Sequence, residues 1–102
     1  MILCDFLPPQ RDRSWDYARQ IGVTHAIVRC HPRDTGLPPP YDLDALRTVQ
    51  RNFAAAGITV LGLEGDEFDM RRIKLGLPGR EEDLARYCQM LTNMGQLGIR
   101  LL

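Results

Sequence analysis

The chain has 102 residues, of which 44% are hydrophobic and 25% are charged, and its 13 basic side chains balance 13 acidic ones. This composition is typical of a soluble globular domain with one hydrophobic core. A neutral charge balance argues against nucleic-acid and anionic-lipid binding, and no apolar run approaches the ~18 residues of a membrane span.

The N-terminal segment and the cysteines favour a cytoplasmic protein. Met1 leads almost directly into the apolar run ILCDFL, without a positively charged leader or a small-residue cleavage site. The three cysteines, Cys4, Cys30 and Cys88, are an odd number without CxxC spacing, and each lies in an apolar pattern. We therefore expect them to be buried, reduced thiols that bind no metal.

In the first half of the chain, residues 2–6 and 24–29 are predicted to form strands. Between them, SWDYARQIG is predicted to be a helix with Ser14 as N-cap and Gly22 as its stop. HPRDTGLPPPY is predicted to be a loop because of its prolines. Asp42 is predicted to cap an amphipathic helix that ends at Gly57.

In the second half, residues 58–63 are predicted to form a third strand and residues 65–79 a long loop. A further helix is predicted from an apolar stripe, and residues 99–102 are predicted to begin a fourth strand. The stripe consists of Leu84, Tyr87, Cys88, Leu91 and Met94.

A helix-ending glycine precedes three of the predicted strands, at Gly22, Gly57 and Gly98. Successive glycines are 35 and 41 residues apart, which is the size of a βα unit. The pattern predicts an α/β fold with a parallel sheet and right-handed crossovers. The long loops all follow strands, so functional groups are expected at the carboxyl ends of the strands. No GxGxxG or P-loop motif supports nucleotide binding.

Both a TIM barrel and an open doubly wound sheet are compatible with these repeats. A closed (β/α)₈ barrel typically needs ~250 residues, and this sequence supplies three βα units and the start of a fourth. We expect residues 1–102 to be the N-terminal portion of a single (β/α)₈-type domain without an internal boundary.

The segment IKLGLPGREEDLARYCQMLTNMGQLGIRLL resembles the mannonate dehydratase family, in which a KLGLP-x-R segment leads from the third strand into a helix with an NMG-x-x-GI junction. The resemblance implies a TIM barrel of the xylose-isomerase-like kind. It also implies a hydro-lyase of D-glucuronate catabolism that converts D-mannonate to 2-keto-3-deoxy-D-gluconate with Fe²⁺ or Mn²⁺.

Two features of this sequence depart from the family. CDFLPPQRD stands where members usually have a Trp-Tyr-Gly-like segment, and DMRRIKLG lacks the histidine that often precedes IKLG. The family's metal ligands, a Cys, His and Asp set, come from later strands. No metal ligand is therefore assigned in this chain, and the 102 residues alone are expected to bind no metal and to be inactive.

Five residues are candidates to face the substrate: His31, Glu64, Asp66, Lys74 and Arg80. Glu64 and Asp66 follow the third strand and can contact sugar hydroxyls or support metal ligands, or be solvated loop carboxylates. His31 can donate to a substrate oxygen, or be a surface or packing residue. Lys74 can likewise contact the substrate or be a surface residue. Arg80 can hold the mannonate carboxylate or neutralise the acidic EED that follows it.

The IKLGLP segment has a structural interpretation. Ile73, Leu75 and Leu77 are predicted to pack over the barrel rim, while Gly76 and Gly79, with Pro78 between them, shape the entry to the next helix.

Two alternatives to the dehydratase stay open. One is a sugar isomerase or epimerase on the same barrel type. The other is a non-catalytic truncated remnant or assembly module that exposes its sheet edge, through which the chain can self-associate. A small-molecule sugar acid remains the expected partner, with no nucleic acid and no membrane.

Overall fold

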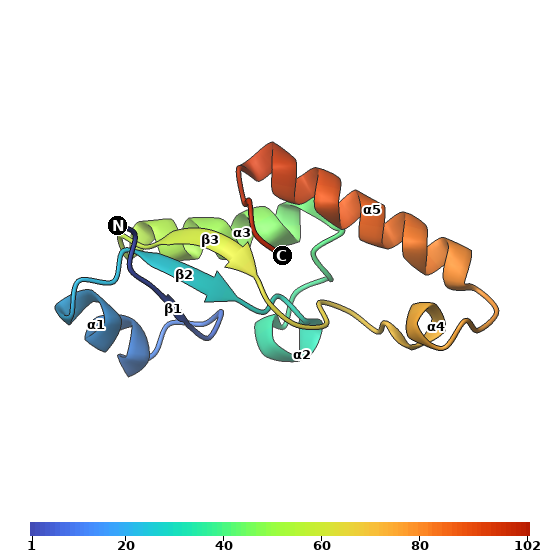
Figure 1. Cartoon of the computed structure of the whole chain (residues 1–102). Coiled ribbons are helices and arrows are strands. Elements are labelled where there is room, and N and C mark those ends of the chain that lie inside the picture. Colours follow the sequence, from blue (N-terminus) through green and yellow to red (C-terminus); the bar gives the residue numbers. More distant parts are fainter.

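The computed structural model describes all 102 residues and has an α/β architecture. Three strands alternate with helices along the chain, and Figure 1 shows how they are arranged. In order they are β1 (Cys4–Phe6), α1 (Arg13–Gln20), β2 (His25–Val28), α2 (Pro32–Thr35), α3 (Leu43–Ala55), β3 (Thr59–Leu63), α4 (Arg71–Lys74) and α5 (Arg80–Leu97).

The strands form an open parallel sheet in the order β1-β2-β3, as the glycine junctions predict. His25 of β2 is paired with Cys4 on one side and Thr59 on the other. The predicted fourth strand is reduced to one parallel bridge between Gly62 and Leu101, in which the Leu63 N–H donates to the Leu101 carbonyl at 3.0 Å. The structure is thus compatible with consecutive βα units.

Capping side chains begin the two amphipathic helices α1 and α3. Asp42 caps α3 as predicted, because its Oδ1 accepts from the Ala45 N–H at 2.9 Å. The prediction that Ser14 caps α1 is wrong. Asp12 is the N-cap and accepts from the Ser14 N–H at 2.8 Å, so Ser14 lies inside the first turn.

Two short helices interrupt the segments predicted to be loops. α2 begins directly after His31, with Pro32 at a first-turn position where its missing N–H costs no helical hydrogen bond. α4 follows Asp69, whose Oδ1 accepts from the Arg71 N–H at 3.0 Å. Local capping by His31 therefore outweighs the general loop preference of proline at α2, whereas α4 has no side-chain cap.

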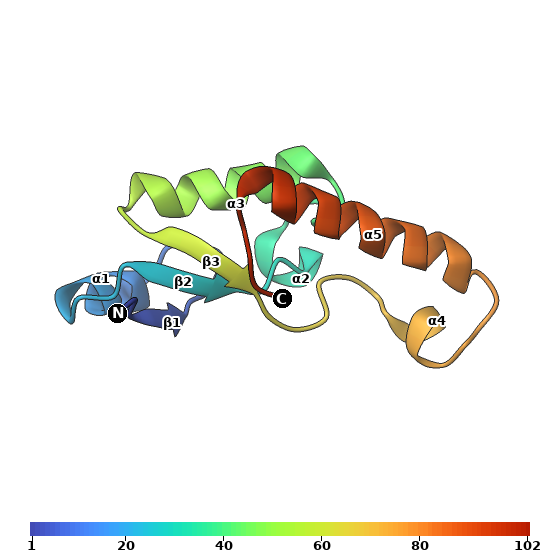
Figure 2. The same cartoon turned by 45° about the horizontal axis from the view of Figure 1, so that its top comes forward.

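A single core lies between the sheet and one layer of helices. Alternation along β2 buries Ala26 and Val28 completely, and the rings of Trp15 and Phe53 stack at 4.0 Å between their centroids, joining α1 to α3. Figure 2 shows α3 and α5 on the same side of the sheet. The opposite face is bare, and Phe6 of the edge strand β1 is 54% exposed.

The predicted apolar stripe of α5 is largely wrong. Leu84, Cys88 and Leu91 are exposed and Tyr87 is half-buried, so Met94 is the one residue of the predicted stripe that the helix buries. The buried set is Asp83, Met90, Asn93 and Met94. A polar side chain sets which face of the helix is buried, because the Asn93 amide donates to the carbonyls of Pro40 at 3.1 Å and Tyr41 at 2.9 Å.

The packed-rim interpretation of the IKLGLP segment is wrong as well. Leu75 and Leu77 are 68% and 41% exposed, and Ile73 is half-buried. The glycines match their predicted role, since Gly76 and Gly79 have φ of 65° and 89°. The segment contains the last residues of α4, Ile73 and Lys74, and then the turn that leads to the N-terminal end of α5.

Burial of the cysteines also differs from the prediction. Only Cys30 is buried, while Cys4 and Cys88 are exposed, and all three are free thiols. Cys4 lies on the edge strand and Cys88 on the solvent side of α5, because neither element is covered there. None of the helices is long and apolar enough to cross a membrane.

Candidate functional site

A groove of about 1060 Å³ opens at the carboxyl ends of β2 and β3. Its walls come from the segment around α2, the loop after β3, α4 and the start of α5. Six cationic side chains line it against only three carboxylates, although the whole chain is neutral. The cations are Arg29, Arg33, Arg71, Arg72, Lys74 and Arg86, and the carboxylates are Asp66, Asp69 and Asp83.

Arg29 and His31 reach the groove because they follow β2 directly. Arg29 Nε donates to Asp34 Oδ2 at 2.7 Å, and this contact lowers the pKa of Asp34 and raises the pKa of Arg29. His31 Nδ1 accepts from the Arg33 N–H at 3.1 Å and caps α2. The capping contact leaves Nε2 as the ring atom available to a ligand.

An ionic cluster at Asp83 fixes the far wall. Arg72 Nε lies 2.6 Å from Asp83 Oδ2 and its second nitrogen 2.5 Å from Oδ1, which makes a bidentate pair between α4 and α5. Arg86 Nη1 adds a contact to the same carboxylate at 3.2 Å. The Asp83 side chain is only 4% exposed, and the hydrogen bond from Arg72 holds its pKa below the usual range.

The remaining groove cations differ in their partners. Lys74 Nζ contacts both oxygens of Asp66, at 2.6 and 2.8 Å, and Arg71 is paired with Asp69 at 3.0 Å. Both pairs are more than half exposed, so water and salt weaken them. Arg33 is exposed and forms no ion pair with any carboxylate of the chain. It is therefore the cation freest to bind an anion.

A smaller cavity of about 310 Å³ adjoins the groove. The two share the lining residues Asp66, Phe68, Met70 and Lys74. Glu67 also lines the cavity and is 2% exposed. Its Oε2 accepts from the Cys30 N–H at 2.5 Å, which ties the loop after β3 to the end of β2.

The second oxygen of Glu67, Oε1, is buried without a hydrogen-bond partner. Burial raises the pKa of this carboxyl to about 7, against the smaller opposing effects of the Cys30 N–H and the Arg29 charge. A carboxyl group with such a pKa can accept or release a proton near neutral pH.

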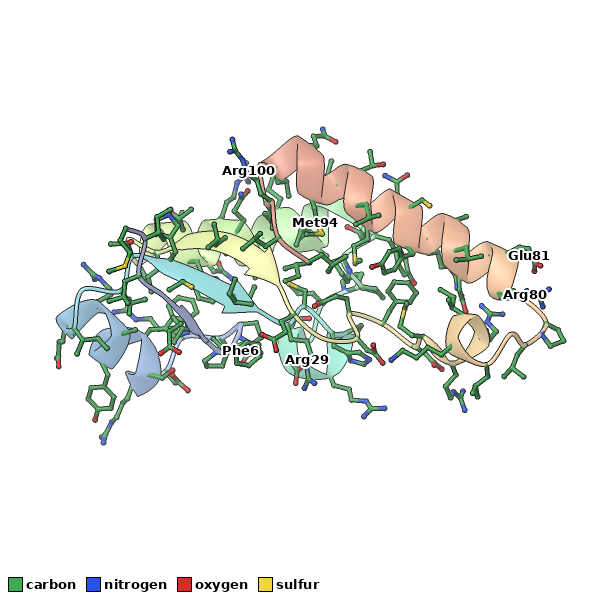
Figure 3. The ribbon with its side chains drawn as sticks, in the orientation of Figure 1. Phe6, Arg29, Arg80, Glu81, Met94 and Arg100 are labelled. Carbon is green, nitrogen blue, oxygen red and sulfur yellow. The ribbon has the colours of Figure 1, made fainter.

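The structure brings most of the predicted site residues together. His31, Asp66 and Lys74 line the groove, and Glu64 lines the adjoining cavity with an exposed side chain. Arg80 is not part of either space. Its guanidinium donates to the Gly76 carbonyl at 3.0 Å and lies 3.5 Å from Glu81, at the end of α5 distant from Arg29 (Figure 3).

Sequence reasoning missed the residues that shape the site most, Glu67 and the Arg72–Asp83 pair. Glu67 lies in the run GDEFD, three positions after Glu64, and a run with so many carboxylates is expected to be exposed to solvent. The position of Glu67 in the sequence could have identified it. Glu67 lies near the carboxyl end of β3, and Arg29 lies near the carboxyl end of the adjacent parallel strand β2.

No group of three or more His, Cys, Asp or Glu side chains is placed to hold a metal ion. The cationic groove suits an anion, and the cavity beside Glu67 suits a neutral polar group.

No protein-family model matches the chain, and no solved structure matches it.

Proposed function

We propose that this chain binds a sugar acid in the cationic groove and contributes to the substrate site of a mannonate dehydratase-like hydro-lyase. The observation that carries the proposal is the cluster of six cations at the carboxyl ends of the strands, among which exposed Arg33 forms no ion pair. Ligands of parallel α/β folds bind at this edge. The resemblance of the IKLGLP segment and following helix to that family supports the same assignment.

The proposal places residues 1–102 in the N-terminal portion of a xylose-isomerase-like TIM barrel. The parallel β1-β2-β3 order, with Leu101 beginning to pair beside β3, supports this placement. The bare sheet face would then point into the barrel. By the family resemblance, Fe²⁺ or Mn²⁺ is held by later strands, so the residues described here serve substrate binding.

Arg33 is the proposed first contact for the substrate carboxylate. It lines the groove and forms no ion pair, and a guanidinium can bind a carboxylate in bidentate fashion. His31, Asp66 and Lys74 lie along the same groove, where the polyol chain of a sugar acid offers hydroxyls to them.

The binding test is a titration of the chain with D-mannonate, followed by amide NMR shifts. We expect changes in the amide shifts of groove residues, and these changes should become smaller as salt is added. We expect Arg33→Gln to lose affinity for D-mannonate by about tenfold. Arg51→Gln is the matched control, because Arg51 is exposed on α3 outside the groove. Equal loss in both variants, or no shifts in the wild-type chain, would contradict the proposed site.

The catalytic test uses the same chain with D-mannonate and Fe²⁺ or Mn²⁺ under reducing conditions. We expect no 2-keto-3-deoxy-D-gluconate from the 102 residues alone, and product from a longer polypeptide if the reading frame continues past Leu102. Metal-dependent product from the short chain would refute its inactivity. A longer polypeptide that binds metal without dehydrating mannonate would count against the substrate assignment.

A further inference from the structure

The unpaired oxygen of Glu67 points to a second binding determinant beyond the cationic groove. Glu67 is 2% exposed, yet only its Oε2 has a partner, the Cys30 N–H. Buried carboxylate oxygens are almost always hydrogen-bonded, because an unpaired one loses its hydration without replacement. Oε1 of Glu67 is the only buried side-chain oxygen or nitrogen of the chain left in this state.

The cavity beside Glu67 has the size and lining of a small-molecule site. Its volume of about 310 Å³ lies at the lower end of the ~300–1,000 Å³ typical of ligand pockets. Leu63, Phe68 and Met90 provide apolar walls, while Lys74 and Tyr87 provide polar groups. This mixture suits a molecule with both C–H surfaces and hydroxyl groups.

We propose that this cavity binds a polyhydroxylated small molecule and that Glu67 Oε1 hydrogen-bonds one of its hydroxyls. The inference deepens the proposed function and rests on it for the identity of the ligand as a sugar acid. Glu67 then orients the hydroxylated carbon chain, while the adjoining groove holds the carboxylate. The two spaces share Asp66 and Lys74, so one ligand can contact both.

The proposal predicts a link between ligand binding and the protonation of Glu67. A hydroxyl that donates to Oε1 stabilises the ionised carboxylate and lowers its pKa from about 7. By reciprocity, the polyol binds more tightly above pH 7 than below it. The other charged or titratable groups around Glu67 are Arg29, Cys30, Asp34, Glu64, Asp66, Lys74 and Tyr87.

The experiment uses D-mannitol, which has the hydroxyls of mannonate but no charge. The ¹³C shift of the Glu67 carboxyl is followed against pH with and without saturating mannitol. We expect the midpoint to fall by about one pH unit, which corresponds to about tenfold tighter binding to the ionised form. The exposed carboxyl of Glu81, outside both spaces, is the internal control.

Glu67→Gln separates this role from a structural one. Glutamine can still accept from the Cys30 N–H, but it cannot titrate. We expect mannitol affinity to become independent of pH from pH 5 to 8, whereas Glu81→Gln keeps the pH dependence. An unchanged pH dependence in folded Glu67→Gln would overturn the proposal. If that variant does not fold, the wild-type titration decides alone.

The outcomes also distinguish this inference from the proposed function. Arg33-dependent mannonate binding without any effect of mannitol on Glu67 would overturn the hydroxyl site and leave the sugar-acid groove in place. A mannitol-dependent fall in the Glu67 midpoint without mannonate binding would support the hydroxyl site and overturn the sugar-acid function.

Discussion

At Glu67, the tertiary structure changes the chemistry of an ordinary residue. Two residues away from the exposed Gly65, its carboxyl group is turned inward and held by the Cys30 N–H. Because burial is the largest influence, its pKa rises to about 7. The folded chain therefore binds a proton that the unfolded chain releases at lower pH.

This difference makes stability depend on pH. The unfolded pKa is about 4.5 and the folded pKa about 7, so the stabilising contribution is full below pH 4.5 and is lost as the pH rises through 7. We expect the stability of the wild type relative to Glu67→Gln to fall by about 2–3 kcal/mol between pH 5 and pH 8. Urea unfolding of both proteins at both pH values measures this difference.

Comparing the wild type with Glu67→Gln cancels the contributions that other carboxyl groups make to the pH dependence of stability. Asp34, Asp69 and Asp83 have lowered pKa values and are ionised in both proteins from pH 5 to 8. Glu81→Gln is the matched control, because Glu81 is 74% exposed. A constant difference between wild type and Glu67→Gln would show that Glu67 titrates normally in the folded chain.

The cysteines give a second residue-scale prediction. Cys4 and Cys88 are exposed, whereas Cys30 is buried and its pKa is raised, first by burial and then by the charge of Glu67. We expect a thiol reagent such as DTNB to modify two cysteines rapidly in the native chain and the third only on unfolding. Cys30→Ala should keep both fast phases, and three equally fast thiols would contradict the burial of Cys30.

At the scale of elements, charge rather than apolar contact joins α4 to α5. The leucines of the connecting turn are exposed, while Arg72 and Arg86 converge on the buried Asp83. A carboxylate in the first turn of α5 is also favoured by the partial positive charge of the helix N-terminus. Asp83 therefore positions the wall of the groove that α4 carries.

Asp83→Asn should loosen this wall. The variant loses the charge that pairs with both arginines, so we expect a lower Tm and faster hydrogen exchange in α4 than in the wild type. Asp69→Asn, which breaks the exposed pair with Arg71, should have a clearly smaller effect. Equal exchange rates in α4 for the wild type and Asp83→Asn would show that the cluster does not hold the helix.

On the scale of the whole molecule, the chain is elongated, and helices cover only one face of its sheet. Its extents are 47 × 24 × 23 Å, and its radius of gyration of 14.2 Å exceeds the ~13 Å of a compact chain of this length. Figure 1 shows the reason, since α4 and the start of α5 extend beyond the sheet. The bare sheet face and its edge strand β1 expose apolar side chains, including Phe6.

We expect the isolated chain to self-associate through this edge. Unpaired strand edges with exposed apolar side chains promote pairing between molecules. Sedimentation equilibrium should show a mass that rises with concentration, and Phe6→Lys should shift it toward the monomer. Tyr17→Lys is the control, because Tyr17 is 58% exposed on α1 and is not part of a strand. A monomer at all concentrations would refute the association.

The sequence by itself determined the order and type of the main elements. Glycine stops at Gly22, Gly57 and Gly98 and the cap at Asp42 act locally, so they specify helix ends and the parallel βα repeat without reference to the rest of the chain. The same repeat predicted that His31 and Asp66 follow strands at one edge of the sheet, where both line the groove, because parallel strands end at one edge.

Only the tertiary structure decided which face of α5 is buried and which carboxylates are exposed. Leu84 and Met90 both fit an apolar helix stripe, and the anchors at Asp83 and Asn93 select the face with Met90. Glu67 is buried because its loop folds back onto Cys30, which lies 37 residues away in sequence. Such long-range contacts leave no periodic signal in a sequence, since periodicity reports the local backbone and burial depends on what packs against it.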